Sequence, residues 1–350
     1  MYIFLTLLIY TWALYPAIII GSSRLRKKTN TIGKSDLSTT VVIPVYNGEL
    51  SIKQKIENCL ELEHPQELNI VVVSDGSTDQ TCDQVKSFKH PNIKLIQLPE
   101  RMGKSFAQNA GVEASTSETI LFTDVESILE KSALTDLLAR ISSDSNVACV
   151  GGRIAFRNPN IVQKLYWLYE NKLRDAESKL GLLTSISGAA FLVRVDKFTK
   201  LDADTGDDMV IPLDLKLHHG MQTVFVDSVI ASDQLAHIET DILNSRRRIT
   251  RRNLLVIARR KRLLNIFKSP ATSLSILSHK LLRWFTPFCL IGLFVTGIIE
   301  VYRFTGPSTT IFLSALTLMA IYKSRSLRME ITGLLLGTID FIRGARTTFY

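Results

Sequence analysis

The sequence predicts an α/β fold with a mixed, mainly parallel sheet, helices on both faces of the sheet, and transmembrane helices at the N- and C-termini. Two observations predict this architecture. In the middle of the chain, short runs rich in valine and isoleucine alternate with segments of helical spacing. Near each end, uncharged stretches approach the length of about 20 residues that crosses a bilayer. The chain of 350 residues is long enough for about two average domains.

The N-terminal stretch resembles a membrane anchor. No charged residue occurs from Tyr2 to Ile20. A cleaved signal peptide would need a basic leader and a small-residue cleavage site, and neither is evident. We therefore expect residues 1–22 to form a retained transmembrane helix.

The middle of the chain, residues 36–245, has the pattern of one α/β domain. The predicted strands are the apolar runs TVVIPV (40–45), NIVVVS (69–74), IKLIQL (93–98) and TILFTD (119–124). Segments with helical spacing lie between them at 49–60, 78–88 and 104–112. Repetition of strand, helix and strand predicts a parallel sheet that is covered on both sides.

The C-terminal region, residues 281–350, contains two clear candidate spans and one short segment. Residues 284–299 and 304–322 carry no charge, whereas the uncharged run 331–342 is too short to cross a bilayer alone. We expect this third segment to be an interfacial or re-entrant helix that ends at Arg343 and Arg346. Residues 246–280 are predicted to form basic interfacial helices.

A cluster of basic residues accounts for the net charge of +9. Nine cations and no acid lie at Arg246, Arg247, Arg248, Arg251, Arg252, Arg259, Arg260, Lys261 and Arg262. A solvated helix face, a nucleic-acid patch and a contact with anionic lipid are the alternatives. Because a span follows the cluster, lipid or phosphate is favoured, and we expect no nucleic-acid partner.

Basic residues that flank the spans predict the orientation of the protein. They are Arg24, Arg26, Lys27 and Lys28 after the first span, and Lys323, Arg325 and Arg328 after the third. By the positive-inside rule, the middle domain is cytoplasmic, in an integral protein of the plasma (inner) membrane. The four cysteines show no metal or disulfide spacing, as expected in a reducing compartment.

Polar and acidic residues follow three of the predicted strands. They are Pro44, Tyr46, Asn47 and Glu49 after the first strand, Asp75, Gly76, Ser77 and Asp79 after the second, and Asp124 and Glu126 after the fourth. An isolated Asp-Gly-Ser is an ordinary turn. Ligands of parallel sheets bind at the carboxyl ends of the strands, so acids at three such ends predict a binding site.

Several nucleotide-binding and hydrolytic classes are excluded by the motifs. No Gly-rich dinucleotide fingerprint follows an early strand, and the Gly-Lys-Ser at 103–105 lacks the P-loop glycine because Leu98 stands in its place. The chain has no His-Glu-x-x-His zinc motif and no Gly-x-Ser-x-Gly nucleophile elbow. Asp124 and Glu126, one residue apart, instead suit a hard divalent cation, Mg²⁺ or Mn²⁺, that also binds a diphosphate.

An ordered set of motifs carries a family resemblance. The set is VVIPVYNGE, VVVSDGSTDQT, RMGKSFAQNAG, LFTDVES, ISGAAFLVR and GDDMVIPLDL, within residues 39–255. It resembles family 2 glycosyltransferases with the GT-A (Rossmann-like) fold. With its flanking spans, the chain is similar to the membrane-bound branch that includes cellulose, hyaluronan and poly-N-acetylglucosamine synthases.

The resemblance implies roles for individual residues. Donor contacts fall on Pro44, Tyr46, Glu49, Asp75, Lys104, Asp124 and Arg248, with Asp75 on the uracil side of a UDP-linked sugar. Asp124 and Glu126 match the Asp-x-Asp metal motif, with glutamate in place of the second aspartate. Gly188, Ala189 and Asp207 fall near the acceptor, and Asp208 matches the general base.

Residue chemistry alone leaves two of these roles open. Asp208 precedes an apolar pattern that could bury a helix face, so on spacing alone it is equally a helix cap or a base. The small residues of SISGAAFLVR (185–194) suit either core packing or close approach of a sugar to the backbone.

Two departures from the synthase pattern bear on the product. Ser245 and Ile249 stand where the synthases have the glutamine and tryptophan of their Gln-x-x-Arg-Trp motif. We therefore expect an inverting transferase that acts on a glycan or lipid-linked acceptor, with single addition to a lipid as the alternative to a polymer. A catalytically inactive membrane scaffold or sugar-nucleotide sensor is the alternative outside the enzyme class.

Overall fold

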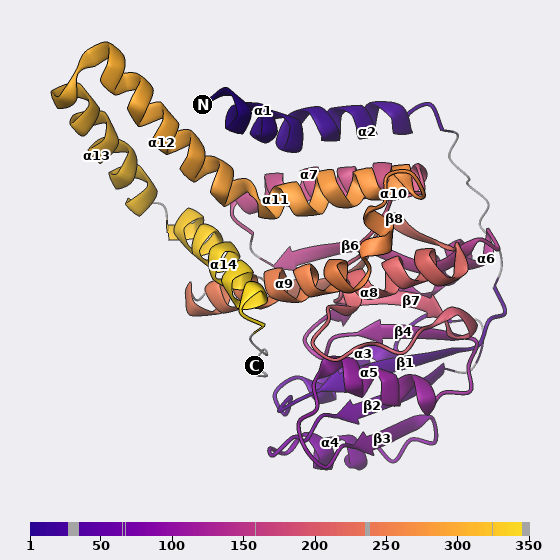
Figure 1. Cartoon of the computed structure of the whole chain (residues 1–350). Coiled ribbons are helices and arrows are strands. Elements are labelled where there is room, and N and C mark those ends of the chain that lie inside the picture. The colour runs from indigo at the N-terminus through magenta and orange to yellow at the C-terminus, as the bar shows by residue number, and fades with distance from the viewer. Residues whose placement is uncertain are drawn as a thin grey trace. The chain divides into compact units, whose positions relative to one another are not determined.

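A computed structural model describes residues 1–26, 35–64, 66, 68–157, 159–234, 239–323 and 325–344 (Figure 1). The chain divides into two compact units. One comprises residues 22–235 with 348–350, and the other comprises residues 1–21 with 236–347. The predicted flanking cations Lys27, Lys28 and Arg346 lie outside the described residues.

The first unit is built on a mixed sheet with the strand order β3-β2-β1-β4-β7-β6-β8-β5. The strands are β1 (Thr39–Val45), β2 (Leu68–Ser74), β3 (Ile93–Gln97), β4 (Thr119–Thr123), β5 (Ile128–Leu129), β6 (Val147–Arg157), β7 (Ala190–Arg194) and β8 (Gln222–Gln234). Strands β1 to β4 are mutually parallel and confirm the four strands predicted from the valine-rich and isoleucine-rich runs. The buried side chains of β1, β2 and β4 on both faces are typical of a sheet that helices cover twice, whereas β3, at the edge of the sheet, is partly exposed.

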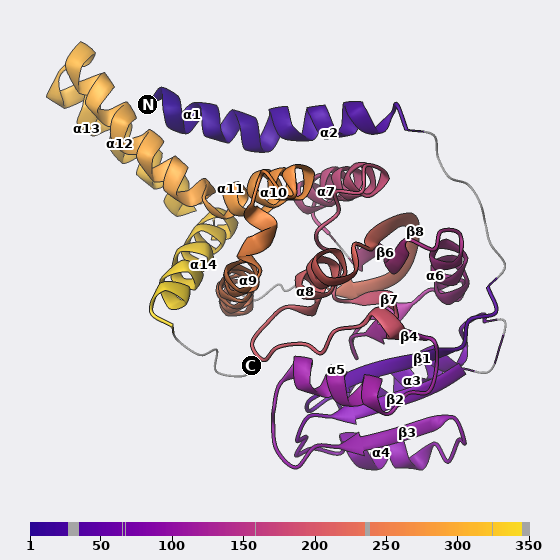
Figure 2. The same ribbon diagram turned by 45° about the vertical axis from the view of Figure 1, so that its right-hand side comes forward.

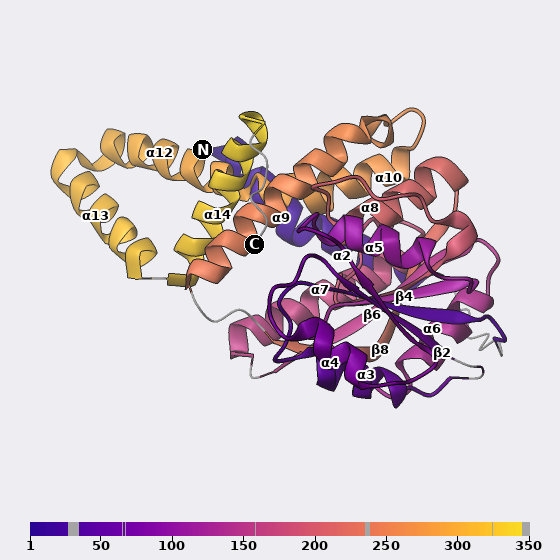
Figure 3. The same cartoon turned by 90° about the horizontal axis from the view of Figure 1, so that it is seen from below.

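Helices cover both faces of this sheet. They are α3 (Ile52–Leu60), α4 (Thr81–Ser87), α5 (Lys104–Glu113), α6 (Ala133–Ser142), α7 (Ile161–Lys179) and α8 (Asp207–Asp214), with short turns at Val195–Lys197 and Leu215–His219. Ile52 and Ile56 of α3 share a core with Val41 and Ile43 of β1. On the other face, Gly111 of α5 lies directly over Val42, so α3 and α5 lie on opposite sides of the sheet (Figure 3).

An antiparallel strand places a second loop at the edge where β4 ends. Strand β7 pairs with β4 in antiparallel register, with Ala190 opposite Thr123. The residues just before β7 therefore lie beside the residues just after β4. This pairing brings the predicted acceptor segment and the predicted metal motif to the same edge of the sheet.

The second unit is helical. Its elements are α1 (Tyr2–Ile9), a short π-helix (Tyr10–Leu14), α2 (Tyr15–Ser23), α9 (Glu239–Arg259), a 3₁₀-helix (Lys261–Leu264), α10 (Pro270–Ser275), a second short π-helix (Ile276–Leu281), α11 (Leu282–Trp284), α12 (Thr286–Thr305), α13 (Pro307–Lys323) and α14 (Arg325–Ile342). Within the described residues, Tyr2–Ser23 and Thr286–Thr305 are long and apolar enough to cross a membrane. Helices α12 and α13 form a hairpin that coincides with the two predicted C-terminal spans (Figure 2).

The third C-terminal segment is longer than its uncharged run and packs on a basic helix. Residues 331–342 belong to α14, an 18-residue helix that lies against α9. An added Cβ at Gly333 would lie 2.6 Å from the Cβ of Arg246, and one at Gly337 would lie 2.5 Å from the carbonyl oxygen of Arg247. These glycines therefore let the two helix backbones approach closely, as small residues four apart do elsewhere.

Ion pairs complete this helix pair. Arg246 binds Glu330 at 2.7 Å, and Arg247 binds Asp340 through two nitrogens. Two of the nine clustered cations therefore neutralise acids of α14. Helix α9 also runs continuously through residue 245, where the sequence suggested a domain boundary.

Candidate active site

The carboxyl ends of β1 and β4 form the centre of the site. Strand β1 pairs with β2 up to Val45, but with β4 only up to Val42. Pro44, which has no N–H to donate, is thus accommodated where the pairing with β4 has ended. Because β2 and β4 lie on opposite sides of β1, this is the switch point at which open α/β sheets bind ligands.

Asp75, directly after β2, anchors the loop that leads into α5. Its carboxylate accepts hydrogen bonds from the N–H of Met102 at 2.7 Å and of Gly103 at 2.8 Å, and it is buried. Gly76 has a φ of +68°, and a Cβ there would lie 2.6 Å from the backbone nitrogen of Arg101. The Asp-Gly pair therefore fixes where α5 begins, with Lys104 as its first residue.

Two loops at this edge are tied together by reciprocal contacts. The Glu49 N–H donates to Asp79, and the Gln80 N–H donates to the Glu49 carboxylate at 3.1 Å. Burial opposes ionisation of Asp79, but hydrogen bonds from the Thr81 hydroxyl and from backbone N–H groups outweigh it and lower the pKa of Asp79. The loops after β1 and β2 thus form one connected rim.

Tyr46 presents an aromatic ring at this rim. The guanidinium carbon of Arg101 lies 3.8 Å from the centre of the ring, within the range of a cation–π contact. Arg101 is not among the site residues predicted from the sequence. Its signal was weak, since it is one cation in a loop whose position depends on Asp75.

A lysine with two acids forms the most concentrated charge cluster at this edge. The Lys104 ammonium lies 2.6 Å from Asp124 and 3.1 Å from Asp207. Gln108, one turn later on α5, donates to the same Asp207 oxygen at 2.7 Å. A Cβ added to Gly188 would lie 3.5 Å from Asp207 and 3.7 Å from the Lys104 nitrogen, so this glycine borders the cluster.

The charge state of Lys104 follows from its neighbours. Burial alone would lower its pKa, but the negative charges of Asp124 and Asp207, and the hydrogen bonds to them, outweigh that effect and raise the pKa. Lys104 is therefore cationic at any physiological pH. A cation held by two carboxylates at this position is a natural partner for the oxygens of a phosphate.

Asp208 lies beside this cluster at the start of α8. Gly206 caps the helix, and Asp207 and Asp208 are its first two residues. The backbone carbonyl of Asp208 accepts a hydrogen bond from the Ile186 N–H at 2.9 Å, which ties α8 to the segment that contains Gly188. The partly exposed side chain of Asp208 is thus placed by a short helix and by the loop before β7.

A buried lysine supports the Asp124–Glu126 segment from inside the domain. Lys55 of α3 is fully buried, and its ammonium donates to the Thr123 hydroxyl at 2.7 Å and to the Ser127 carbonyl at 2.5 Å. These two acceptors bracket the predicted metal motif. The Thr123 hydroxyl in turn donates to the Ala189 carbonyl, which also accepts from the Asp124 N–H.

Two further residues of the site, Lys55 and Gln108, were not predicted from the sequence, for different reasons. Lys55 is a lone charge on the face of α3 that Ile52 and Ile56 bury, and that mismatch was its only signal. Gln108 lies four residues after Lys104, so helical spacing alone could have placed the two together.

The carboxylates fit a metal that arrives with its ligand. Asp124 is partly exposed and Glu126 is exposed, and no third histidine, cysteine, aspartate or glutamate joins them among the described residues. Mg²⁺ is usually held by one or two carboxylates together with substrate phosphates and water. The residues present therefore fit Mg²⁺ or Mn²⁺ bound jointly with a diphosphate, and they do not form an all-protein cage.

The structure gathers some of the predicted residues and leaves others apart. Lys104, Asp124, Asp207 and Gly188 meet within a few ångströms, and Asp208 follows directly. Tyr46, Glu49 and Asp75 lie at the adjacent strand ends, while the side chains of Pro44 and Ala189 are buried. Arg248 lies on α9 in the other unit, and its contact with a nucleotide stays a prediction.

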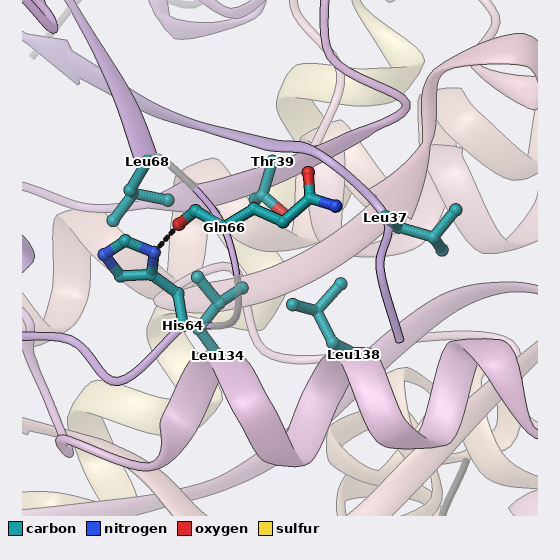
Figure 4. Close-up of a pocket in the computed structure, with 7 residues that line it drawn as sticks. All are labelled: Leu37, Thr39, His64, Gln66, Leu68, Leu134 and Leu138. Atoms are coloured by element: carbon teal, nitrogen blue, oxygen red, sulfur yellow. Dashed lines mark hydrogen bonds between the residues drawn. The ribbon is translucent and has the colours of Figure 1, made fainter. Parts of the chain in front are cut away.

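A small pocket lies at the opposite edge of the sheet (Figure 4). It is lined by Leu37, Thr39, His64, Gln66, Leu68, Leu134 and Leu138. Thr39 and Leu68 are the first residues of β1 and β2, so the pocket lies at the amino ends of these strands. It is therefore separate from the acids at the carboxyl ends.

Comparison with known proteins shows what the domain is similar to. The family model described as glycosyl transferase family 2 matches residues 40–202. An N-acetylglucosaminyltransferase of Rhizobium meliloti is 26% identical over 215 residues, which cover 55% of this chain and 50% of that protein. A dolichyl-phosphate beta-glucosyltransferase of Trichomonas vaginalis is 34% identical over 118 residues, 31% of this chain and 35% of its own length. The chain thus spans half or less of the length of these relatives.

A solved structure matches almost the entire chain. It is the mannosyltransferase PcManGT from Pyrobaculum calidifontis in complex with GDP-Man and Mn²⁺, with a TM-score of 0.77, 19% identity, and coverage of 98% of this chain and 99% of that one. The match confirms the GT-A fold predicted from the motif order.

Proposed function

Because the chain carries a glycosyl transferase family 2 domain, we propose that it moves a sugar, with inversion, from a nucleotide-sugar donor to a glycan or lipid-linked acceptor. The reaction would occur at the cytoplasmic face of the plasma (inner) membrane. Its product would enter a cell-envelope polysaccharide or a glycolipid.

One observation carries the proposal: a single ammonium group joins the donor and acceptor sides of the site. Lys104 contacts Asp124, the residue expected at the metal and diphosphate, and Asp207, the residue expected at the acceptor. Lys104 begins α5, Asp124 follows β4 and Asp207 begins α8. The β4–β7 pairing places the loop before β7 beside the end of β4, and the hydrogen bond from the Ile186 N–H to the Asp208 carbonyl ties α8 to that loop. Such convergence suits a reaction in which a diphosphate leaves while a hydroxyl attacks.

The chemistry assigns one role to each side of the site. Asp208 would accept the proton of the acceptor hydroxyl as its oxygen forms a bond to the anomeric carbon. The bond from that carbon to the nucleoside diphosphate breaks at the same time on the opposite face of the sugar. Lys104 would contact the departing diphosphate, and a divalent ion on Asp124 and Glu126 would neutralise its charge.

The acceptor class is the less constrained half of the proposal. The Trichomonas relative bears a name that specifies a dolichyl phosphate acceptor, and the Rhizobium relative is named for N-acetylglucosamine transfer. Ser245 and Ile249 replace residues of the synthase motif, which favours single addition over a polymer. A lipid-linked acceptor is therefore the version that we favour.

The decisive experiment is a screen of nucleotide sugars with the purified full chain in vesicles, with Mn²⁺ or Mg²⁺ and with a chelator as control. We expect metal-dependent release of a nucleoside diphosphate and a product extended by one sugar. Protein that neither binds a nucleoside diphosphate with metal nor hydrolyses any nucleotide sugar contradicts the proposal. That result would favour a membrane scaffold, whereas binding without turnover would favour a sugar-nucleotide sensor.

Two substitutions separate the assigned roles. Asp208→Asn removes the base but keeps the side chain nearly isosteric, so nucleotide binding should persist while transfer is lost. Asp124→Ala should weaken both binding and transfer. Full activity of the Asp208→Asn protein would show that another group takes the proton.

A further inference from the structure

The N-terminal half of α7 exposes an apolar stripe. Ile161, Leu165 and Leu168 have 68%, 59% and 53% of their surface exposed. Their spacing of four and three residues places them on one face of the helix. Val162, at the edge of this face, is 71% exposed. A soluble surface rarely presents such a row of large apolar side chains without a partner.

The stripe belongs to a well-anchored helix and not to a frayed end. Asn160 and Gln163 form a reciprocal capping box that fixes the first turn. On the inner side, Trp167 packs on Phe156 of β6 with ring centres 4.5 Å apart. Leu173 is fully buried farther along the helix. The apolar side chains are therefore held outward by a fixed scaffold.

Charged neighbours indicate what the stripe contacts. Lys164 and Lys172 are exposed, and at about 100° per residue they fall within the same arc as Ile161, Leu165 and Leu168. Apolar side chains flanked by lysines on one exposed helix face are typical of helices that lie in a bilayer interface. The lysines complement the negative charge of anionic headgroups.

The connectivity of the chain places a bilayer within reach. The unit that contains α7 is continuous at residues 21–22 and 235–236 with the unit that carries the two long apolar helices. A catalytic unit tethered at both ends to a membrane region is confined near the membrane surface. Under the proposed membrane location, a lipid surface therefore lies within reach of α7.

We infer that α7 is a membrane-contacting helix whose apolar stripe, Ile161, Leu165 and Leu168, inserts into the interface of a bilayer that contains anionic lipid. The inference rests on the proposed membrane location and deepens it. Contact through α7 sets how close the site lies to the headgroups, which is where a lipid-linked acceptor presents its reactive end.

The test is the depth of a spin label in the full chain. A Leu165→Cys variant is made in a Cys82→Ser background, because the other cysteines are buried. The labelled protein is reconstituted into vesicles of phosphatidylcholine and phosphatidylglycerol. Collisions with oxygen, which concentrates in the bilayer, are compared with collisions with a water-soluble nickel chelate. The matched control is Asp83→Cys on α4, whose side chain is 85% exposed.

Each outcome decides the inference. A higher ratio of oxygen to nickel collisions at position 165 than at 83, which falls when phosphatidylglycerol is omitted, supports it. Equal ratios would show a solvated stripe, and a label protected from both reagents would show that protein covers it; either result overturns the inference. The measurement needs no turnover, so failure of sugar transfer in the same vesicles would reject the proposed function alone.

Discussion

Replacing Lys104 with methionine should affect metal binding and catalysis in opposite directions. The Lys104 ammonium lies 2.6 Å from Asp124, the carboxylate expected to bind the metal. A metal ion must displace the Lys104 ammonium from Asp124 or share that carboxylate with it. Without the lysine, Asp124 is free of that competition, and the site gains one unit of negative charge.

The magnitude follows from the geometry. Two unit charges 2.6 Å apart attract by about 6 kcal/mol at an effective dielectric constant of about 20. About a third of each side chain is exposed, so solvent screening reduces the net value to about 1 kcal/mol, or about 3 kcal/mol if the hydrogen bond is strong. The Lys104→Met protein should therefore bind Mn²⁺ about 5 to 100 times more tightly when no nucleotide is present.

Turnover should fall in the same variant. The diphosphate loses a charge-assisted contact, and such contacts contribute about 1.5 to 3 kcal/mol, or roughly a 10- to 100-fold loss in kcat/KM. Manganese binding is measured by electron paramagnetic resonance, and transfer by release of nucleoside diphosphate. Lys94→Met, on an exposed position of β3, removes the same charge away from the site and should change neither quantity.

The pH dependence gives a further check. The pKa of Lys104 is raised in the folded protein, so its ion pairs are complete below the ordinary lysine pKa of about 10.4 and are lost only as the pH rises through the higher value. The effect of the substitution should therefore be constant from mildly acidic to mildly alkaline pH. Manganese affinity that is unchanged or weaker in Lys104→Met would refute the competition between lysine and metal.

Three other predictions follow from buried or closely packed positions. Lys55→Met removes the support under the metal segment and should weaken Mn²⁺–nucleotide binding about tenfold. The free energy of unfolding should change little, because the cost of burying the charge is also removed. Lys53→Met, on the exposed face of the same helix, should have no effect. Gly337→Ala forces α9 and α14 apart and should lower the stability of the detergent-solubilised protein by about 1 to 3 kcal/mol, while Gly297→Ala, with open space around it, should not. The Asp208→Asn protein should have the same melting temperature as the unsubstituted protein, so any loss of transfer reports chemistry and not folding.

The sequence predicted one half of the sheet far better than the other half. Strands β1, β2 and β4 are buried on both faces, so their apolar runs are continuous and easily read, and β3 has a similar run although it is only partly buried. The small residues of 185–194 do not distinguish a strand from a loop at β7, and no strand is predicted from the sequence at β6 or β8. Strand β7 pairs antiparallel with β4 and β6, and β6 pairs parallel with β8 with shifts in register. These pairings join segments that are distant in the sequence, and their register follows from tertiary packing.

The site shows the same division. Acids at strand ends were visible because a hydrophobic run stops at them, and Lys104 came with its motif. The contact between Lys104 and Asp207 was not visible, because it depends on where α8 begins relative to α5. Lys55 was hidden for a different reason: a buried lysine on a short helix looks like a surface residue unless its apolar neighbours are placed in three dimensions.

The length of α14 was underestimated for an electrostatic reason. Counting only uncharged residues starts the segment at Ile331, although the helix begins at Arg325. The charged first turns do not interrupt it, because Glu330 binds an arginine of α9. Charges that would be costly in lipid are thus accommodated within the protein.

The Lys104 bridge also has a consequence for the order of substrate addition. In the structure, Asp207 is tied to Lys104 and Gln108 beside Gly188, and the Asp124 N–H and the Thr123 hydroxyl share the Ala189 carbonyl. Drawing Lys104 toward a diphosphate removes its ion pair with Asp207 on the acceptor side, while Gln108 still donates to that carboxylate. We therefore expect compulsory-order kinetics in which the nucleotide sugar binds first, the acceptor alone forms no stable complex, and the nucleoside diphosphate leaves last.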